Sequence, residues 1–210
     1  MEAAHVAAHG SADYLRLARR AKLLSWASLA YMALEGLVAI VAGVVAGSIA
    51  LIGFGIDSAI EGFASVIIVW RFTGSRTLSA QAERTAQRLV AVQFFILAPY
   101  VAVEALRALA TAARPEESLV GIGLAASSLV VMPLLGRAKQ RIGARIDSSA
   151  TASEGRQNLL CAYLAAALLI GLVGNALLGA WWLDPAVALL IAAVAVQEGR
   201  EAWRGEACCR

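Results

Sequence analysis

The sequence predicts an all-α membrane protein with six transmembrane helices and cytoplasmic N- and C-termini. The chain is 60% hydrophobic and only 16% charged, with a mean hydropathy of +0.71. Soluble domains are typically about 45–50% apolar and about 25% charged. Apolar stretches of bilayer length recur along the chain, and most charged residues lie between them. The composition and its periodic arrangement therefore indicate a multi-pass membrane protein.

Six apolar stretches are long enough to cross a bilayer, whose hydrocarbon core of about 30 Å needs roughly 20 helical residues. They lie at roughly 23–46, 48–72, 89–110, 118–136, a fifth ending near 179, and 181–197. The first 22 residues lack the apolar core of a signal peptide, so we expect the first span to be retained as an uncleaved anchor. We divide the chain into a cytoplasmic tail (1–22), a six-helix transmembrane domain (23–200) and a short cytoplasmic tail (201–210).

Basic residues predict the orientation. All of the 18 Lys and Arg residues except Arg107 and Arg114 fall in the two tails or in and beside the loops after the second and fourth spans. Under the positive-inside rule this bias places both termini in the cytoplasm. The net charge of +3 and the pI near 9.0 come from the same bias. We expect no nucleic-acid partner, because a basic stripe with interleaved aromatic residues is missing.

Turn and capping residues separate the spans. Gly47 predicts a tight hairpin between the first two spans. Asp184 can cap the sixth helix, with Pro185 at the first helical position. Pro99 and Pro133 fall within the third and fourth spans, where a proline bends a helix. These short connections predict a compact bundle.

Two carboxylates, Asp57 and Glu61, lie inside the second apolar stretch. Their spacing of four residues puts both on one face of a helix. Each charge at the bilayer centre costs roughly 2.5–3.5 kcal/mol, and such residues usually face a polar cavity or an ion pathway. Two carboxylates that converge on one point indicate a cation site. The alternative is a protonated pair that is hydrogen-bonded to neighbouring helices.

A second polar pair, Glu154 and Asn158, depends on where the fifth helix begins. A helix from about 145 to 170 would carry both residues into the membrane on one face. Small residues at 146–153 would then leave room for water from the cytosol. The alternative is a helix that begins at the cytoplasmic edge, with Glu154 as its cap. Gln157 would replace Asn158 if the register differed by one residue.

Other polar residues in the spans have simpler interpretations. Glu35 either joins the cavity or pairs with an arginine. Glu104 and Arg107, three residues apart, are expected to form an ion pair. Gln93 and Asn175 are expected to form hydrogen bonds between helices.

Cysteine and histidine give few clear ligands. Cys161 is expected to be a small packing residue. Cys208 and Cys209 lie in the predicted cytoplasmic tail, where they could bind a soft metal, carry a palmitoyl group or have no role. His5 and His9 would share a helical face, but two ligands alone make a weak metal site.

The residues 43–61, GVVAGSIALIGFGIDSAIE, resemble the first and second helices of the cation diffusion facilitators, the cation efflux superfamily. In that family a Gly-Ser-Xaa-Ala-Leu turn leads into a helix with two metal ligands four residues apart, and Asp57 and Glu61 match these positions. The family's second ligand pair, commonly His and Asp on the fifth helix, matches Glu154 and Asn158. The residues 181–192, WWLDPAVALLIA, resemble the family's entry into helix six.

The resemblance implies a transporter and no enzymatic activity. Family members export a divalent metal, often zinc, in exchange for protons by alternating access of a homodimer. The chain resembles a compact form without the family's C-terminal cytoplasmic domain, because it ends about ten residues after helix six. We therefore expect a multi-pass protein of the plasma (inner) membrane, with the transported ion as its substrate and no prosthetic group.

The expected ligands Asp57, Glu61, Glu154 and Asn158 offer only oxygen. Zinc accepts carboxylates, but oxygen-only sites suit Mn²⁺, Mg²⁺ and Ca²⁺ at least as well. We expect a divalent transition metal, with zinc as the first candidate. Clustered carboxylates also bind protons, so metal entry would displace protons and metal release would readmit them.

Two other functions stay open. The two acids could bind an organic cation, although such substrates need an aromatic-lined pocket and the sequence places only Phe54 and Phe63 near the acids. The chain could also be a non-transporting membrane partner of another protein, which would leave the paired acids unexplained. Metal-dependent catalysis is not expected, since the sequence contains neither HExxH nor GxSxG.

Overall fold

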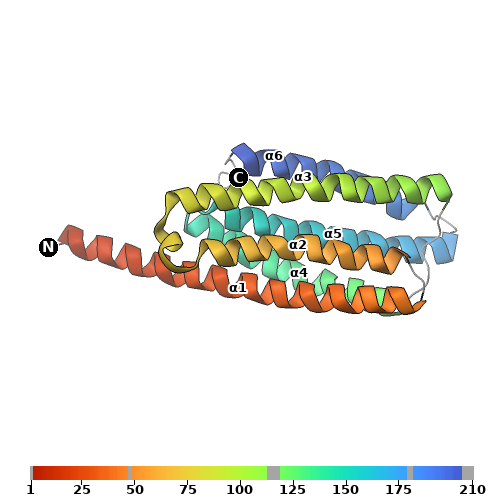
Figure 1. Ribbon diagram of the computed structural model, residues 1–210, viewed down its shortest axis with the longest axis horizontal. Helices are drawn as coiled ribbons and strands as arrows, with labels where there is room; N and C mark the ends of the chain where they lie inside the picture. Colours follow the sequence, from red (N-terminus) through yellow and green to blue (C-terminus); the bar gives the residue numbers. More distant parts are fainter. Residues whose placement is uncertain (1, 47–48, 113–118, 179–181, 205–210) are drawn as a thin grey trace.

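The structure, a computed structural model, describes residues 2–46, 49–112, 119–178 and 182–204 (Figure 1). Every regular element in these ranges is helical, which confirms the predicted all-α fold class. The elements are α1 (Glu2–Ala46), α2 (Ile49–Arg71), the short 3₁₀ helix η1 (Gly74–Leu78), α3 (Ala80–Thr111), α4 (Leu119–Arg145), α5 (Ser149–Leu178) and α6 (Leu183–Arg204).

The six α-helices lie side by side along the long axis of the molecule (Figure 1). They pack mainly in three pairs, α1 with α2, α3 with α6, and α4 with α5. Helix α5 also contacts α2, α3 and α6, so it is the most central helix of the bundle. Helix α1 includes the expected N-terminal tail and projects beyond the end of the bundle.

The described residues have the surface of a membrane protein. Three helical segments are long and apolar enough to cross a bilayer, at Ala12–Val45, Ala80–Thr111 and Leu119–Arg145. Large apolar side chains such as Leu34 and Leu134 point outward, whereas many buried positions hold alanine or serine. These features indicate an integral membrane protein. The expected total of six spans and the orientation of the termini stay predictions.

Glycines bring two of the helix pairs into close contact. A Cβ atom at Gly55 of α2 would lie 2.8 Å from the carbonyl oxygen of Gly36 in α1. A Cβ atom at Gly155 of α5 would lie 2.7 Å from the carbonyl oxygen of Gly136 in α4. Only glycine leaves room for such approaches. The expected hairpin residue Gly47 lies outside the described residues.

The beginning of α5 is set by side chains that bind its first turn. The Ser148 hydroxyl accepts a hydrogen bond from the amide of Thr151 at 3.2 Å. Oε1 of Glu83 in α3 accepts one from the amide of Ala150 at 3.0 Å. The helix therefore begins later than the expected position near 145, because α4 continues to Arg145. Glu154 lies inside α5 and does not cap it.

Candidate functional site

The two acids of α2 face the interior of the bundle. Glu61 is only 3% exposed, and Asp57 is half-buried one turn away on the same face. Neither oxygen of Glu61 accepts a hydrogen bond from the described residues, and Oδ1 of Asp57 accepts none either. The Cys161 thiol of α5 lies beside Glu61, but a thiol is a weak donor and both carboxylate oxygens stay free of a well-formed hydrogen bond. The pair thus offers free oxygen atoms to a cation.

A third carboxylate, Glu35 of α1, lies close to this pair. It is buried, and it accepts hydrogen bonds from the hydroxyls of Ser58 at 3.0 Å, Tyr31 at 3.2 Å and Ser128. Its charge is near enough to repel those of Asp57 and Glu61. The sequence left two roles open for Glu35, a place in the cavity or a pair with an arginine, and its position beside the acids of α2 favours the first. Because its carboxylate oxygens already accept hydrogen bonds from three hydroxyls, they are less available to bind an ion.

The polar pair of α5 surrounds a lysine. The Lys139 ammonium of α4 donates hydrogen bonds to Oε1 of Glu154 at 2.7 Å and to Oδ1 of Asn158 at 2.9 Å. It donates a third to the hydroxyl of Ser28 in α1 at 2.6 Å. Lys139 is 0% exposed and Glu154 is 1% exposed. The second oxygen of Glu154 accepts a hydrogen bond from Ser25 at 2.7 Å.

The two halves of the expected site are neighbours. Lys139 is near enough to Glu61 for their opposite charges to attract. Among the described residues, however, no three His, Cys, Asp or Glu side chains are arranged to hold one metal ion. Asp57, Glu61 and Glu154 therefore do not meet around a single point in this conformation. The four-residue ligand set stays a prediction.

The role of Lys139 was not predicted from the sequence. Its position among the basic residues beside the loop after the fourth span predicted a cytoplasmic side chain, but it lies on the buried face of α4. The signal was its spacing from Gly136 and Gly143, which share this face and allow α5 to approach. This spacing predicts a buried Lys139, but its pairing with Glu154 also depends on the register of α5, which the distant Glu83 helps to fix.

Several smaller predictions can be compared with the structure. Arg107 and Glu104 form the expected ion pair at 2.7 Å. Gln93 of α3 donates to the carbonyl oxygen of Ile60 in α2, which confirms a hydrogen bond between helices. Gln157 is buried, and neither polar atom of its side chain has a hydrogen-bond partner among the described residues. Five other residues with predicted roles have side chains that the structure does not describe: His5, His9, Asn175, Cys208 and Cys209.

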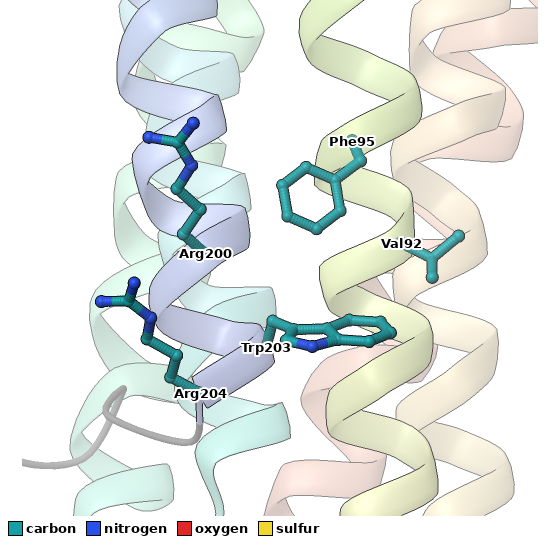
Figure 2. Close-up of a pocket in the computed structure, with 5 residues that line it drawn as sticks. All are labelled: Val92, Phe95, Arg200, Trp203 and Arg204. Carbon is teal, nitrogen blue, oxygen red and sulfur yellow. The ribbon is translucent and has the colours of Figure 1, made fainter.

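A groove between α3 and α6 is a poor candidate for a cation site. It has a volume of about 520 Å³ and is lined by Val92, Phe95, Arg200, Trp203 and Arg204. Figure 2 shows the Phe95 ring of α3 on the side toward α6 and the Trp203 ring of α6 reaching toward α3, with both arginines on α6. Two positive charges and no carboxylate would repel a metal ion. The acids of α2 are therefore the better candidates for a cation site.

Comparisons with known proteins extend over most of the chain. A family model described as the cation efflux transmembrane domain matches residues 25–204. Transmembrane protein 163 of Xenopus laevis is 24% identical over 183 residues, which cover 86% of this chain. The same alignment covers 65% of that relative, so the chain spans a little less than two thirds of its length. The region matched by the family model includes Glu35, Asp57, Glu61 and Glu154.

Proposed function

This chain belongs to the cation efflux family, and from that premise we propose that it transports a divalent metal cation across a membrane. In this proposal the ion binds first at Asp57 and Glu61 of α2. Glu154 and Asn158 of α5 complete the ligand set during the transport cycle. The proposal rests most heavily on one observation, the buried oxygens Oδ1 of Asp57 and Oε1 and Oε2 of Glu61, which have no hydrogen-bond partner among the described residues.

Electrostatics supports a cation at this position. A buried carboxylate without a hydrogen bond is costly, and two that repel each other cost more. A divalent ion would neutralise both charges and satisfy their free oxygens at once. The mutual repulsion of Asp57, Glu61 and Glu35 means that metal and protons would compete for the same carboxylates. Exchange of the metal for protons follows from that competition.

Zinc is our first candidate for the ion, with manganese or a similar transition metal next. The proposed ligands are oxygen atoms, which zinc accepts although protein zinc sites favour nitrogen and sulfur. The Cys161 thiol lies beside Glu61 but does not form a three-ligand group with both α2 acids in this conformation. If it joined them during the transport cycle, its sulfur would favour zinc over magnesium or calcium. This neighbour supports a transition metal.

The proposal includes a membrane arrangement. The helices α2, α5 and α6 contain 23, 30 and 22 residues, lengths that allow each to cross a bilayer beside the three apolar segments found above. Six spans with both termini in the cytoplasm would agree with the distribution of Lys and Arg. We further propose that the protein acts as a homodimer in the plasma membrane, by alternating access.

A transport assay on the purified protein tests this function. Proteoliposomes would be loaded with a metal-sensitive dye, or with a pH-sensitive dye in parallel, and exposed to Zn²⁺, Mn²⁺, Mg²⁺ and Ca²⁺ in turn. We expect zinc or manganese to enter faster than in protein-free liposomes, with an opposite movement of protons. Equal rates with and without protein for all four ions would contradict the proposal.

A further inference from the structure

We propose that Lys139 is a tethered cation that competes with the transported metal for the oxygens of Glu154 and Asn158, and so sets the metal affinity of the site. This inference rests on the proposed function. It concerns a residue of α4, whereas the proposed metal ligands are on α2 and α5. In this arrangement the metal and the ammonium cannot occupy the α5 oxygens together.

The contacts of Lys139 are those of a bound cation. An ammonium group has three N–H donors, and here three different oxygens accept from it at 2.6–2.9 Å. These oxygens come from α1 and α5, so the lysine of α4 joins three helices. The ammonium is completely buried from bulk solvent, and the protein supplies an acceptor for each of its three N–H donors.

Charge explains why this arrangement affects the metal. The Lys139–Glu154 pair is neutral, so Glu154 contributes little attraction to an ion at Asp57 and Glu61 while the lysine is in place. A metal that bound Glu154 directly would also meet the positive ammonium within a few ångströms, where repulsion in a buried site is strong. Metal binding to the complete ligand set therefore requires the ammonium to leave the α5 oxygens, and this displacement lowers the affinity.

A purely structural ion pair would behave differently. Removing one partner of a buried pair destabilises the fold in either case, so stability alone does not distinguish the two roles. Competition predicts in addition that metal binds more tightly when the ammonium is removed, and only if Glu154 remains as a carboxylate. Arg156 provides a matched control, because it is a cation on α5 whose partner is Glu198 at 2.5 Å.

The test is zinc binding to the purified full-length protein by equilibrium dialysis. Only binding that Asp57→Asn abolishes is counted, so that zinc on the terminal His and Cys residues is excluded. We expect Lys139→Met to bind zinc at least tenfold more tightly than wild type. Arg156→Gln should stay within twofold of wild type. In the double variant Lys139→Met with Glu154→Gln, the gain in affinity should disappear.

A second variant covers the case in which Lys139→Met does not fold. Ser28→Ala removes one of the three oxygens that hold the ammonium and changes neither the charge nor a proposed metal ligand. It should tighten zinc binding by at least twofold. An affinity that is unchanged in Ser28→Ala and in every folded Lys139 variant would overturn the inference, as would a gain that persists without Glu154. If zinc binding depends on Asp57 but does not change in the Lys139 variants, this inference is wrong and the proposed function stands. If neither the wild type nor any variant shows Asp57-dependent zinc binding, the proposed function is contradicted as well.

Discussion

Arg71 at the end of α2 donates a hydrogen bond from Nε to Oε2 of Glu83 in α3, at 2.8 Å. Both side chains are largely buried. The same carboxylate accepts hydrogen bonds from the amide of Ala150 and the hydroxyl of Ser148, at 3.0 Å each from Oε1. One acid therefore joins α2, α3 and the beginning of α5, and it helps to fix the register that places Glu154 in the bundle.

Replacing Glu83 should destabilise the protein strongly. Glu83→Gln leaves the buried Arg71 without its counter-charge and weakens the hydrogen bonds that residue 83 accepts from the first turn of α5. We therefore expect the free energy of unfolding to fall by about 2–4 kcal/mol. Glu104→Gln is the matched control, because its pair with Arg107 is exposed and should be worth less than about 1 kcal/mol. Thermal unfolding of both variants in detergent measures the difference. Equal melting temperatures would show that the Arg71–Glu83 pair does not stabilise the fold.

Cysteine labelling in cells should reveal the orientation of the loops. In a background with Cys208 and Cys209 changed to Ser, a cysteine at Ser75 or Asp147 should react only with membrane-permeant reagents, since both positions are exposed beside the basic residues. A cysteine at Ala112, near the opposite end of α3, should also react with impermeant reagents. The remaining native cysteine, Cys161, is buried and should react with neither. Impermeant labelling at Ser75 would overturn the predicted orientation.

Enlarging Gly155 should separate α4 from α5. The new methyl group of Gly155→Ala would meet the carbonyl oxygen of Gly136 at 2.7 Å and the amide nitrogen of Gln140 at 2.9 Å. Backbone atoms cannot move aside independently, so we expect the free energy of unfolding to fall by about 1–3 kcal/mol.

The control for this change is Gly123→Ala, where an added methyl group meets nothing within 4 Å. Alanine has a higher helix propensity than glycine, so Gly123→Ala should raise the free energy of unfolding by up to about 1 kcal/mol. Thermal unfolding should therefore show a lower melting temperature for Gly155→Ala and an equal or higher one for Gly123→Ala. A tolerated Gly155→Ala would mean that the two helices lie farther apart than described here.

Much of the fold could be predicted because stretches of high hydropathy identify the helices that are long and apolar enough to lie in a bilayer. The six α-helices follow the apolar stretches, and the prolines at 99 and 133 lie inside helices as predicted. The beginning of α5 could not be predicted, because it depends on Glu83, which is distant in the sequence. Whether the basic N-terminal tail is helical was left open, since charged residues such as Arg and Lys are compatible with both helix and loop; the structure extends α1 through it.

The candidate site was only partly visible in the sequence. Asp57 and Glu61 could be identified because acids are rare in apolar stretches. Lys139 was not identified, because three arginines nearby made it resemble a loop residue: Arg137, Arg141 and Arg145. These arginines point outward from α4, whereas Lys139 faces α5. The spacing of Lys139 from Gly136 and Gly143 places it on the buried face, but its partner depends on how α4 packs against α5.

The most direct test of the account is the initial rate of zinc uptake into proteoliposomes that contain Asp57→Asn, Glu61→Gln or the control Glu104→Gln. Each of the first two substitutions keeps the size of the side chain and removes one of the two charges that would neutralise the ion. We predict at least a tenfold loss of zinc uptake for both, a smaller loss for Glu35→Gln, and a rate within twofold of wild type for Glu104→Gln. Wild-type uptake by folded Asp57→Asn and Glu61→Gln proteins would contradict the claim that these carboxylates bind the transported metal.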